Sequence, residues 1–147
     1  MAQNVQRSVT QILRSVEEKL DEVRSEFLGN MARDLVSRSP VDTGAYVTSH
    51  SITTTSGAGR SRTSENKPRG QDTGAKQQEG LEQLYSDIAA LPAGATKIYI
   101  NNRSPHNKAV EFGGANWTRD GYYVYQTVQG RAKEHLDSAI AKVRSRE

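Results

Sequence analysis

SPVDTGAY, residues 39–46, separates a long helical pattern from a strand-and-loop pattern in this 147-residue chain. Pro40 disfavours helical geometry at the residue before it, so a helix arriving from the N-terminal side is expected to end at Ser39. An Asp side chain bonds backbone amides two residues on, and Gly accepts positive φ, which predicts a tight turn here. The expected structural turn comprises Pro40, Asp42, Thr43 and Gly44.

One apolar stripe runs through the segment 1–39, which we predict to be a long helix. Its members recur every three or four positions, the spacing of one helix face. Thirty helical residues would span about 45 Å, whereas a compact domain of this length is about 40 Å across. The helix is therefore expected to cross the domain or to project from it. The stripe comprises Val9, Ile12, Leu13, Val16, Leu20, Val23, Phe27, Met31 and Leu35.

The sequence after the turn predicts shorter elements. Residues 45–55 alternate loosely and are rich in β-branched side chains, which indicates a half-exposed strand. Residues 56–78 have almost no apolar side chain and predict a long mobile loop, followed by a short helix at 79–91. Residues 96–113 predict strands, and 123–145 a C-terminal helical region, although its first residues, Tyr-Tyr-Val-Tyr, also suit a strand. We expect one α+β domain, with the long N-terminal amphipathic helix and the C-terminal helix packed on a small, mainly antiparallel sheet.

The composition predicts a thin hydrophobic core. Val, Ile, Leu and Phe together number 27 of 147 residues, so the chain is expected to gain stability by burying surface against copies of itself. The net charge of +3 does not force an extended chain. The absence of cysteine excludes disulfides and thiolate metal sites and suits a reducing cytoplasm. We find no apolar run of the roughly 18 residues that a membrane helix needs, and no signal-peptide core.

A second marker, VEFG at residues 110–113, follows the turn by about 65 residues. The order of long helix, Pro-Val-Asp-Thr-Gly, strand, variable loop, strand, Val-Glu-Phe-Gly and C-terminal helix resembles a family of tailed-bacteriophage proteins. These are the neck and tail-completion proteins related to lambda minor tail protein Z. The Tyr-Ala pair that usually precedes the family's second motif is absent here. The residues that match the family motifs are Pro40, Asp42, Thr43, Gly44, Val110, Glu111, Phe112 and Gly113.

The resemblance implies a structural virion protein of the head–tail junction, neither an enzyme nor the holder of a cofactor or metal. Such proteins form rings, commonly of six copies, with twelve as the alternative, and leave a channel for DNA. The implied partners are further copies of the chain, a head connector or portal-side protein, and a tail tube or terminator protein. Contacts with passing double-stranded DNA would be non-specific. The protein would reside in the neck or tail of the virion, and in the host cytoplasm during assembly, with no membrane partner.

Residues 56–78 carry five basic side chains against two acidic ones. These charges suit a solvated loop, but they also suit a surface that faces DNA phosphates or a neighbouring subunit. The second interpretation supports an alternative function, a small nucleic-acid-binding protein that uses residues 60–76. The basic side chains are Arg60, Arg62, Lys67, Arg69 and Lys76.

Catalytic and metal motifs are weak in this sequence. Asp-Thr-Gly occurs at 42–44 and 72–74, and aspartic proteases need two such carboxylates, but neither copy follows an apolar strand, so turn chemistry is the favoured explanation. His50, His106 and His135 lack the spacing of a helical metal pair and are expected at the surface or at an interface.

Two further features leave alternatives open. Glu111 lies in an apolar run, where it either pairs with an Arg of a neighbouring subunit or points outward from a strand. An aromatic cluster near the C-terminal helix serves as core, as an interface patch, or as a stacking platform for nucleic-acid bases. The cluster consists of Trp117, Tyr122, Tyr123 and Tyr125.

Overall fold

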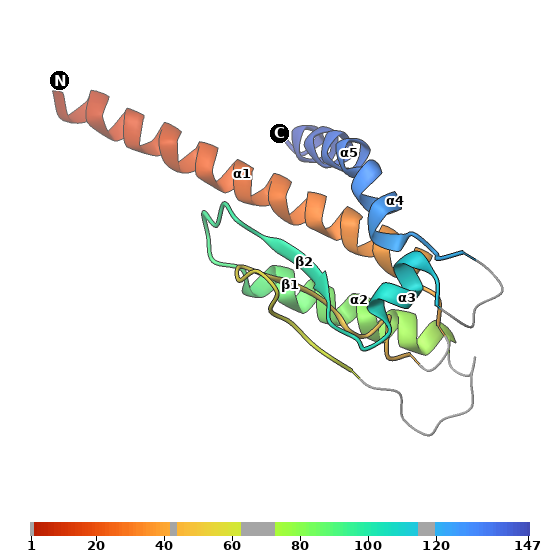
Figure 1. Cartoon of the computed structure of the whole chain (residues 1–147). Coiled ribbons are helices and arrows are strands. Elements are labelled where there is room, and N and C mark those ends of the chain that lie inside the picture. The colour runs from red at the N-terminus through yellow and green to blue at the C-terminus, as the bar shows by residue number, and fades with distance from the viewer. Residues whose placement is uncertain (1, 42–43, 63–72, 115–119) are drawn as a thin grey trace.

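The computed structural model describes residues 2–41, 44–62, 73–114 and 120–147. These residues form an α+β fold, which confirms the predicted class with its long N-terminal helix, its C-terminal helix and its small antiparallel sheet (Figure 1). The elements in chain order are α1 (Ala2–Arg38), β1 (His50–Thr53), α2 (Thr73–Ala90), β2 (Tyr99–Asn102), α3 (Asn107–Phe112), α4 (Val124–Gly130) and α5 (Ala132–Ser145).

Helix α1 is the helix against which α2, α4 and α5 pack. Its 37 residues extend about 55 Å at the usual rise per residue. Helices α4 and α5 lie along one side of its C-terminal half, and the sheet and α2 lie on the other (Figure 1). The core forms where these layers meet, with Leu35 of α1 and Leu84 of α2 at most 1% exposed. The N-terminal half of α1 projects past both layers.

The end of α1 is where Pro40 places it. The Ser39 backbone N–H donates to Val36 O at 3.2 Å, and the Ser39 hydroxyl donates to Leu35 O at 2.7 Å, so the last turn is closed from within. Gly44 then adopts φ +89°, the left-handed conformation expected of the turn. Asp42 and Thr43 lie outside the described residues.

The sheet is shorter than predicted. Strands β1 and β2 pair antiparallel over four residues each, from His50 opposite Asn102 to Thr53 opposite Tyr99. Residues 45–49, predicted as strand, instead form a helical turn. The Thr48 hydroxyl donates to Gly44 O at 2.7 Å and the Ser49 hydroxyl to Ala45 O at 2.6 Å. These local side-chain bonds satisfy the backbone without a partner strand, which is why the β-branched pattern fails there.

Two segments that were predicted as strand and as loop are helical in the structure. Residues 107–112, inside the predicted strand region 96–113, form α3, because the Val110 N–H donates to His106 O at 2.9 Å and the Gly113 N–H to Ala109 O at 2.7 Å. Helix α2 begins at Thr73, although 56–78 was predicted as loop and the helix at 79–91. The first turns of α2 are polar but rich in Ala, Lys, Gln and Glu, which favour helix without an apolar stripe.

A buried polar network joins four elements around His50, which is 1% exposed. Its Nε2 lies 2.8 Å from the Ser39 hydroxyl, and its Nδ1 lies 2.7 Å from the Tyr125 hydroxyl and 3.0 Å from Asn102 Nδ2. Because the Ser39 hydroxyl donates its proton to Leu35 O, we assign the imidazole proton to Nε2 and the acceptor role to Nδ1. The expectation of a surface or interface position for His50 is therefore wrong: its ring links α1, β1, β2 and α4.

Candidate functional site

The apolar stripe of α1 continues beyond the folded body. Helix α5 runs alongside α1 only as far as Glu26 and Lys19, which bind Arg146 and Glu147 at 2.7 and 2.8 Å. On the other side, Arg24 donates to Pro92 O at 3.0 Å. The stripe residues from Val9 to Leu20 are about half exposed or more. They are Val9 at 50%, Ile12 at 62%, Leu13 at 59%, Val16 at 49% and Leu20 at 62% exposed, here called the α1 stripe.

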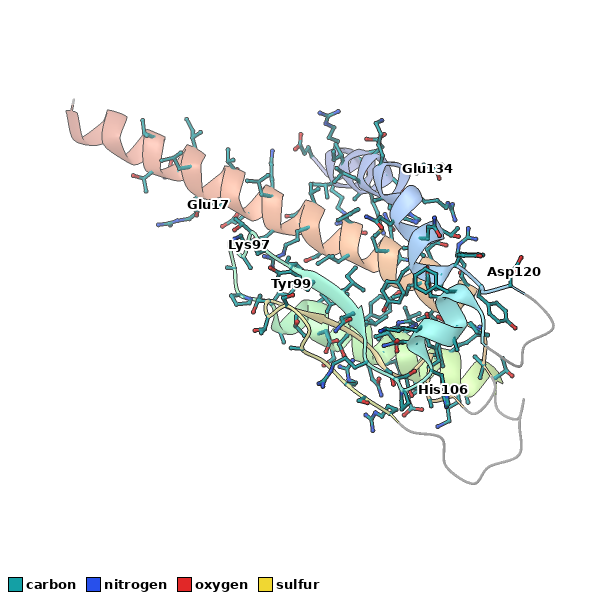
Figure 2. All side chains as sticks on the ribbon, in the orientation of Figure 1. Glu17, Lys97, Tyr99, His106, Asp120 and Glu134 are labelled. Atoms are coloured by element: carbon teal, nitrogen blue, oxygen red, sulfur yellow. The ribbon has the colours of Figure 1, made fainter. Side chains whose placement is uncertain are left out.

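The spacing of the α1 stripe matches a coiled-coil seam. Val9, Leu13, Val16 and Leu20 alternate steps of four and three, and Val23 and Phe27 continue this heptad rhythm into the folded body. A heptad seam presents a flat apolar strip to an opposing element. The exposed part of α1 therefore has the pattern of a packed helix without a covering element among the described residues (Figure 2).

A second exposed apolar surface lies at the other end of the molecule. Phe112, the last residue of α3, is 66% exposed, and Tyr122 and Tyr123 are 37% and 39% exposed. The Tyr122 N–H donates to Val110 O at 2.7 Å and the Tyr123 N–H to Glu111 O at 3.2 Å, so the backbone of both residues lies beside the end of α3. Figures 1 and 2 place α3 and Asp120 far from the N-terminus of α1. We call Phe112, Tyr122 and Tyr123 the aromatic patch.

The predicted aromatic cluster thus divides between core and surface. Tyr125 faces the His50 network, and burial raises the pKa of its hydroxyl. Tyr122 and Tyr123 lie at the surface, while Trp117 is outside the described residues.

Glu111 does not point outward from a strand: it lies in α3, and its carboxylate binds within the chain. Its carboxylate oxygens accept hydrogen bonds from the backbone N–H groups of Tyr125 and Gln126, each at 2.9 Å, at the start of α4. The side chain is buried at 9% exposure, because α3 and α4 pack directly on each other. The Val110–Gly113 segment therefore connects α3 to the core and to α4: Val110 enters the core, Glu111 caps α4, and Gly113 adopts φ +99°.

Replacing Glu111 with Gln is expected to destabilise the protein by about 1–2 kcal/mol, since one carboxylate oxygen that accepts a backbone N–H becomes an amide donor. Chemical denaturation followed by circular dichroism measures this change. Phe112→Ala is the matched control from the same motif: that side chain is largely exposed, so the change should stay within about 0.5 kcal/mol. Equal losses in both variants would contradict the capping role.

The described members of the predicted basic surface lie in different parts of the fold. The Arg60 guanidinium pairs with both carboxylate oxygens of Asp87 and donates to His50 O at 2.7 Å, so it fixes its segment to α2 and β1. Lys76 lies in α2, where its amine contacts Glu79 at 3.2 Å. Arg62 is exposed, and Lys67 and Arg69 lie outside the described residues.

A polar cluster that the sequence reasoning missed joins α1 to α5. The buried Asp34 carboxylate contacts His135 Nε2 at 2.7 Å, Arg38 Nε at 2.6 Å and Arg131 at 3.1 Å. Burial by itself would raise the pKa of Asp34. The hydrogen bonds from His135 and Arg38 outweigh this effect, so the pKa of Asp34 lies below its usual value. Arg38 lies one helical turn from Asp34, but Arg131 and His135 are about 100 residues away, so only the helix pairing brings them to Asp34.

Within the described residues, we find no group of three or more His, Cys, Asp or Glu side chains placed to hold a metal ion. None of the described helices combines the length and apolar character needed to cross a membrane. Comparison of the chain with protein-family models, with curated proteins and with solved structures finds no match in any of the three.

Proposed function

We propose that this protein is a structural part of a tailed-phage head–tail junction, a neck or tail-completion protein that forms a ring and carries out no catalysis. The ring would join the capsid connector to the tail and leave a channel for DNA. It would form in the host cytoplasm and remain in the neck or tail of the virion.

The observation that carries the proposal is the uncovered α1 stripe. Covering a half-exposed Val, Leu or Ile side chain contributes about 1 kcal/mol, so the five together offer roughly 5 kcal/mol that one copy does not use. Contiguous exposed apolar surfaces of this kind mark interaction sites. A chain with a thin core and such a stripe is suited to assembly.

The two family motifs add support through their places in the fold. Pro40 and Gly44 border the turn that ends α1, and the Val110–Gly113 motif joins α3 to α4. Both motifs hold the long helix and the aromatic patch in position relative to the body. Exposed surfaces held in fixed positions suit a structural protein that binds neighbouring subunits.

The solution mass tests this proposal. Light scattering on the full chain should give a discrete mass near six times the 16.2 kDa subunit mass, with twelve copies as the alternative, in low and high salt alike. Negative-stain images should show rings with a channel wide enough for duplex DNA. A ring held by apolar contacts should persist at high salt, because salt screens charges and not apolar burial.

The alternative function, nucleic-acid binding through residues 60–76, predicts a different result. A monomer that binds duplex DNA, with affinity falling steeply as salt rises, would overturn the ring proposal in favour of the alternative. The Arg60–Asp87 pair argues against a DNA role for Arg60, because its guanidinium is already engaged.

A further inference from the structure

We infer that the α1 stripe of one subunit packs on the aromatic patch of the next copy of the same chain, so that successive subunits join head to tail. This inference rests on the proposed ring and names the contact that would build it. It assigns the α1 stripe and the aromatic patch to one interface.

The positions of the two surfaces favour a second copy as the occupant. A head-to-tail contact requires two different surfaces on each subunit, and it makes a ring when the rotation between subunits closes. A symmetric dimer requires a single self-complementary surface. This chain has an aliphatic strip at one end and an aromatic surface at the other, which is the arrangement for head-to-tail joining (Figure 1).

One exposed charge beside the α1 stripe is opposite in sign to one beside the aromatic patch. Glu17 lies one turn from Leu13 and flanks the α1 stripe, and Lys108 lies one turn before Phe112 in α3. Neither residue makes an ion pair within the described part of the chain, and both are exposed. A pair between Glu17 of one copy and Lys108 of the next would set the direction of the contact.

Closure would make the assembly cooperative. Each subunit uses its stripe once and its patch once, so the closed ring contains one contact more than the open chain of equal length. That last contact forms between subunits that are already held together, at high effective concentration. Open intermediates are therefore expected to be scarce beside subunits and rings.

Engineered cysteines test the contact directly, because the chain has none of its own. Ile12→Cys and Phe112→Cys replace side chains that are 62% and 66% exposed, so the fold should tolerate both. Under mild oxidation, the double variant should give a ladder of disulfide-linked species that ends at the ring mass. A mixture of the two single variants should stop at dimers, and each single variant alone should remain unlinked.

A charge exchange provides a second, independent measurement. Glu17→Lys should raise the concentration needed for half-assembly by about fivefold, the scale of one exposed ion pair. Adding Lys108→Glu should restore the original value, whereas Lys133→Glu, placed on α5, should not.

Three results would overturn the contact. Ile12→Cys alone forming dimers would show a symmetric helix-to-helix contact instead. A second result would be that the wild type forms rings, yet neither Ile12→Cys nor Val16→Cys gives disulfide-linked species when combined with Phe112→Cys. This result would reject the interface and leave the ring proposal standing. A monomeric wild type without linkage would reject both, and would assign the stripe to a different protein.

Discussion

Acidification from pH 6.5 to pH 4.5 is expected to lower the free energy of unfolding by about 2–3 kcal/mol through His50 alone. Burial lowers the pKa of His50 from 6.5 to about 3 in the folded protein. The neighbouring Tyr46 and Tyr125 hydroxyls stay neutral throughout this range, since burial raises both of their pKa values. Among the described residues, no carboxylate hydrogen-bonds the ring to hold a proton on it.

The sign follows from where the proton binds. Between pH 6.5 and 3, the unfolded chain protonates His50 and the folded chain does not, so falling pH favours unfolding by about 1.4 kcal/mol per unit. Above pH 6.5 His50 is neutral in both the folded and the unfolded state, and its full contribution to stability is present. The loss therefore begins near pH 6.5 and ends near pH 3.

Urea denaturation at half-unit steps from pH 7 to pH 4.5 measures this dependence. His50→Gln is the control, because Gln keeps hydrogen-bonding groups at the site but does not titrate. The variant should be less stable at pH 7, yet its stability should change less with pH than that of the wild type. Equal pH slopes in the two proteins would show that His50 is not the source.

The second large effect is expected from Gly80→Ala. Gly80 is a buried position of α2, and a Cβ built there would overlap the carbonyl oxygen of Val47 and lie 3.2 Å from its carbonyl carbon. Backbone cannot move aside as a flexible side chain does, so α2 would have to shift away from the 44–48 turn. We expect a loss of about 3 kcal/mol from this forced separation.

Gly74→Ala is the matched control within the same helix. A Cβ at Gly74 meets nothing within 4 Å, so the higher helix propensity of Ala should stabilise the protein, by up to about 1 kcal/mol. Thermal unfolding of the two variants should therefore shift in opposite directions. Stabilisation by both substitutions would mean that α2 does not approach Val47 as closely as the structure has it.

The parts of the fold that the sequence predicts well are the long periodic ones. Nine apolar residues at helical spacing identify α1, and Pro40 sets its end, because both signals act within a few residues of where they occur. The short elements were predicted less well. Residues 45–49 and 107–112 have strand-like composition, yet local hydrogen bonds and packing make both helical.

The candidate interface was predictable in part. The stripe and its excess length are visible in the sequence, and so is the VEFG motif. The capping role of Glu111 was not visible, because its two hydrogen-bond donors lie 14 and 15 residues away and reach it only when α3 packs on α4. The exposure of Phe112 beside Tyr122 and Tyr123 depends on that same packing.

The sequence by itself determined the α+β class, the length and end of α1, and an apolar stripe too long for the body, since these follow from periodicity and from the geometry of proline. Tertiary structure alone decided which part of the stripe is covered. The chain after α5 contacts Lys19 through Glu147, and the stripe residues from Val9 to Leu20 remain exposed. Tertiary structure also decided that His50 is buried and that Arg60 pairs with Asp87, because burial and ion pairing depend on which distant segments fold against each residue.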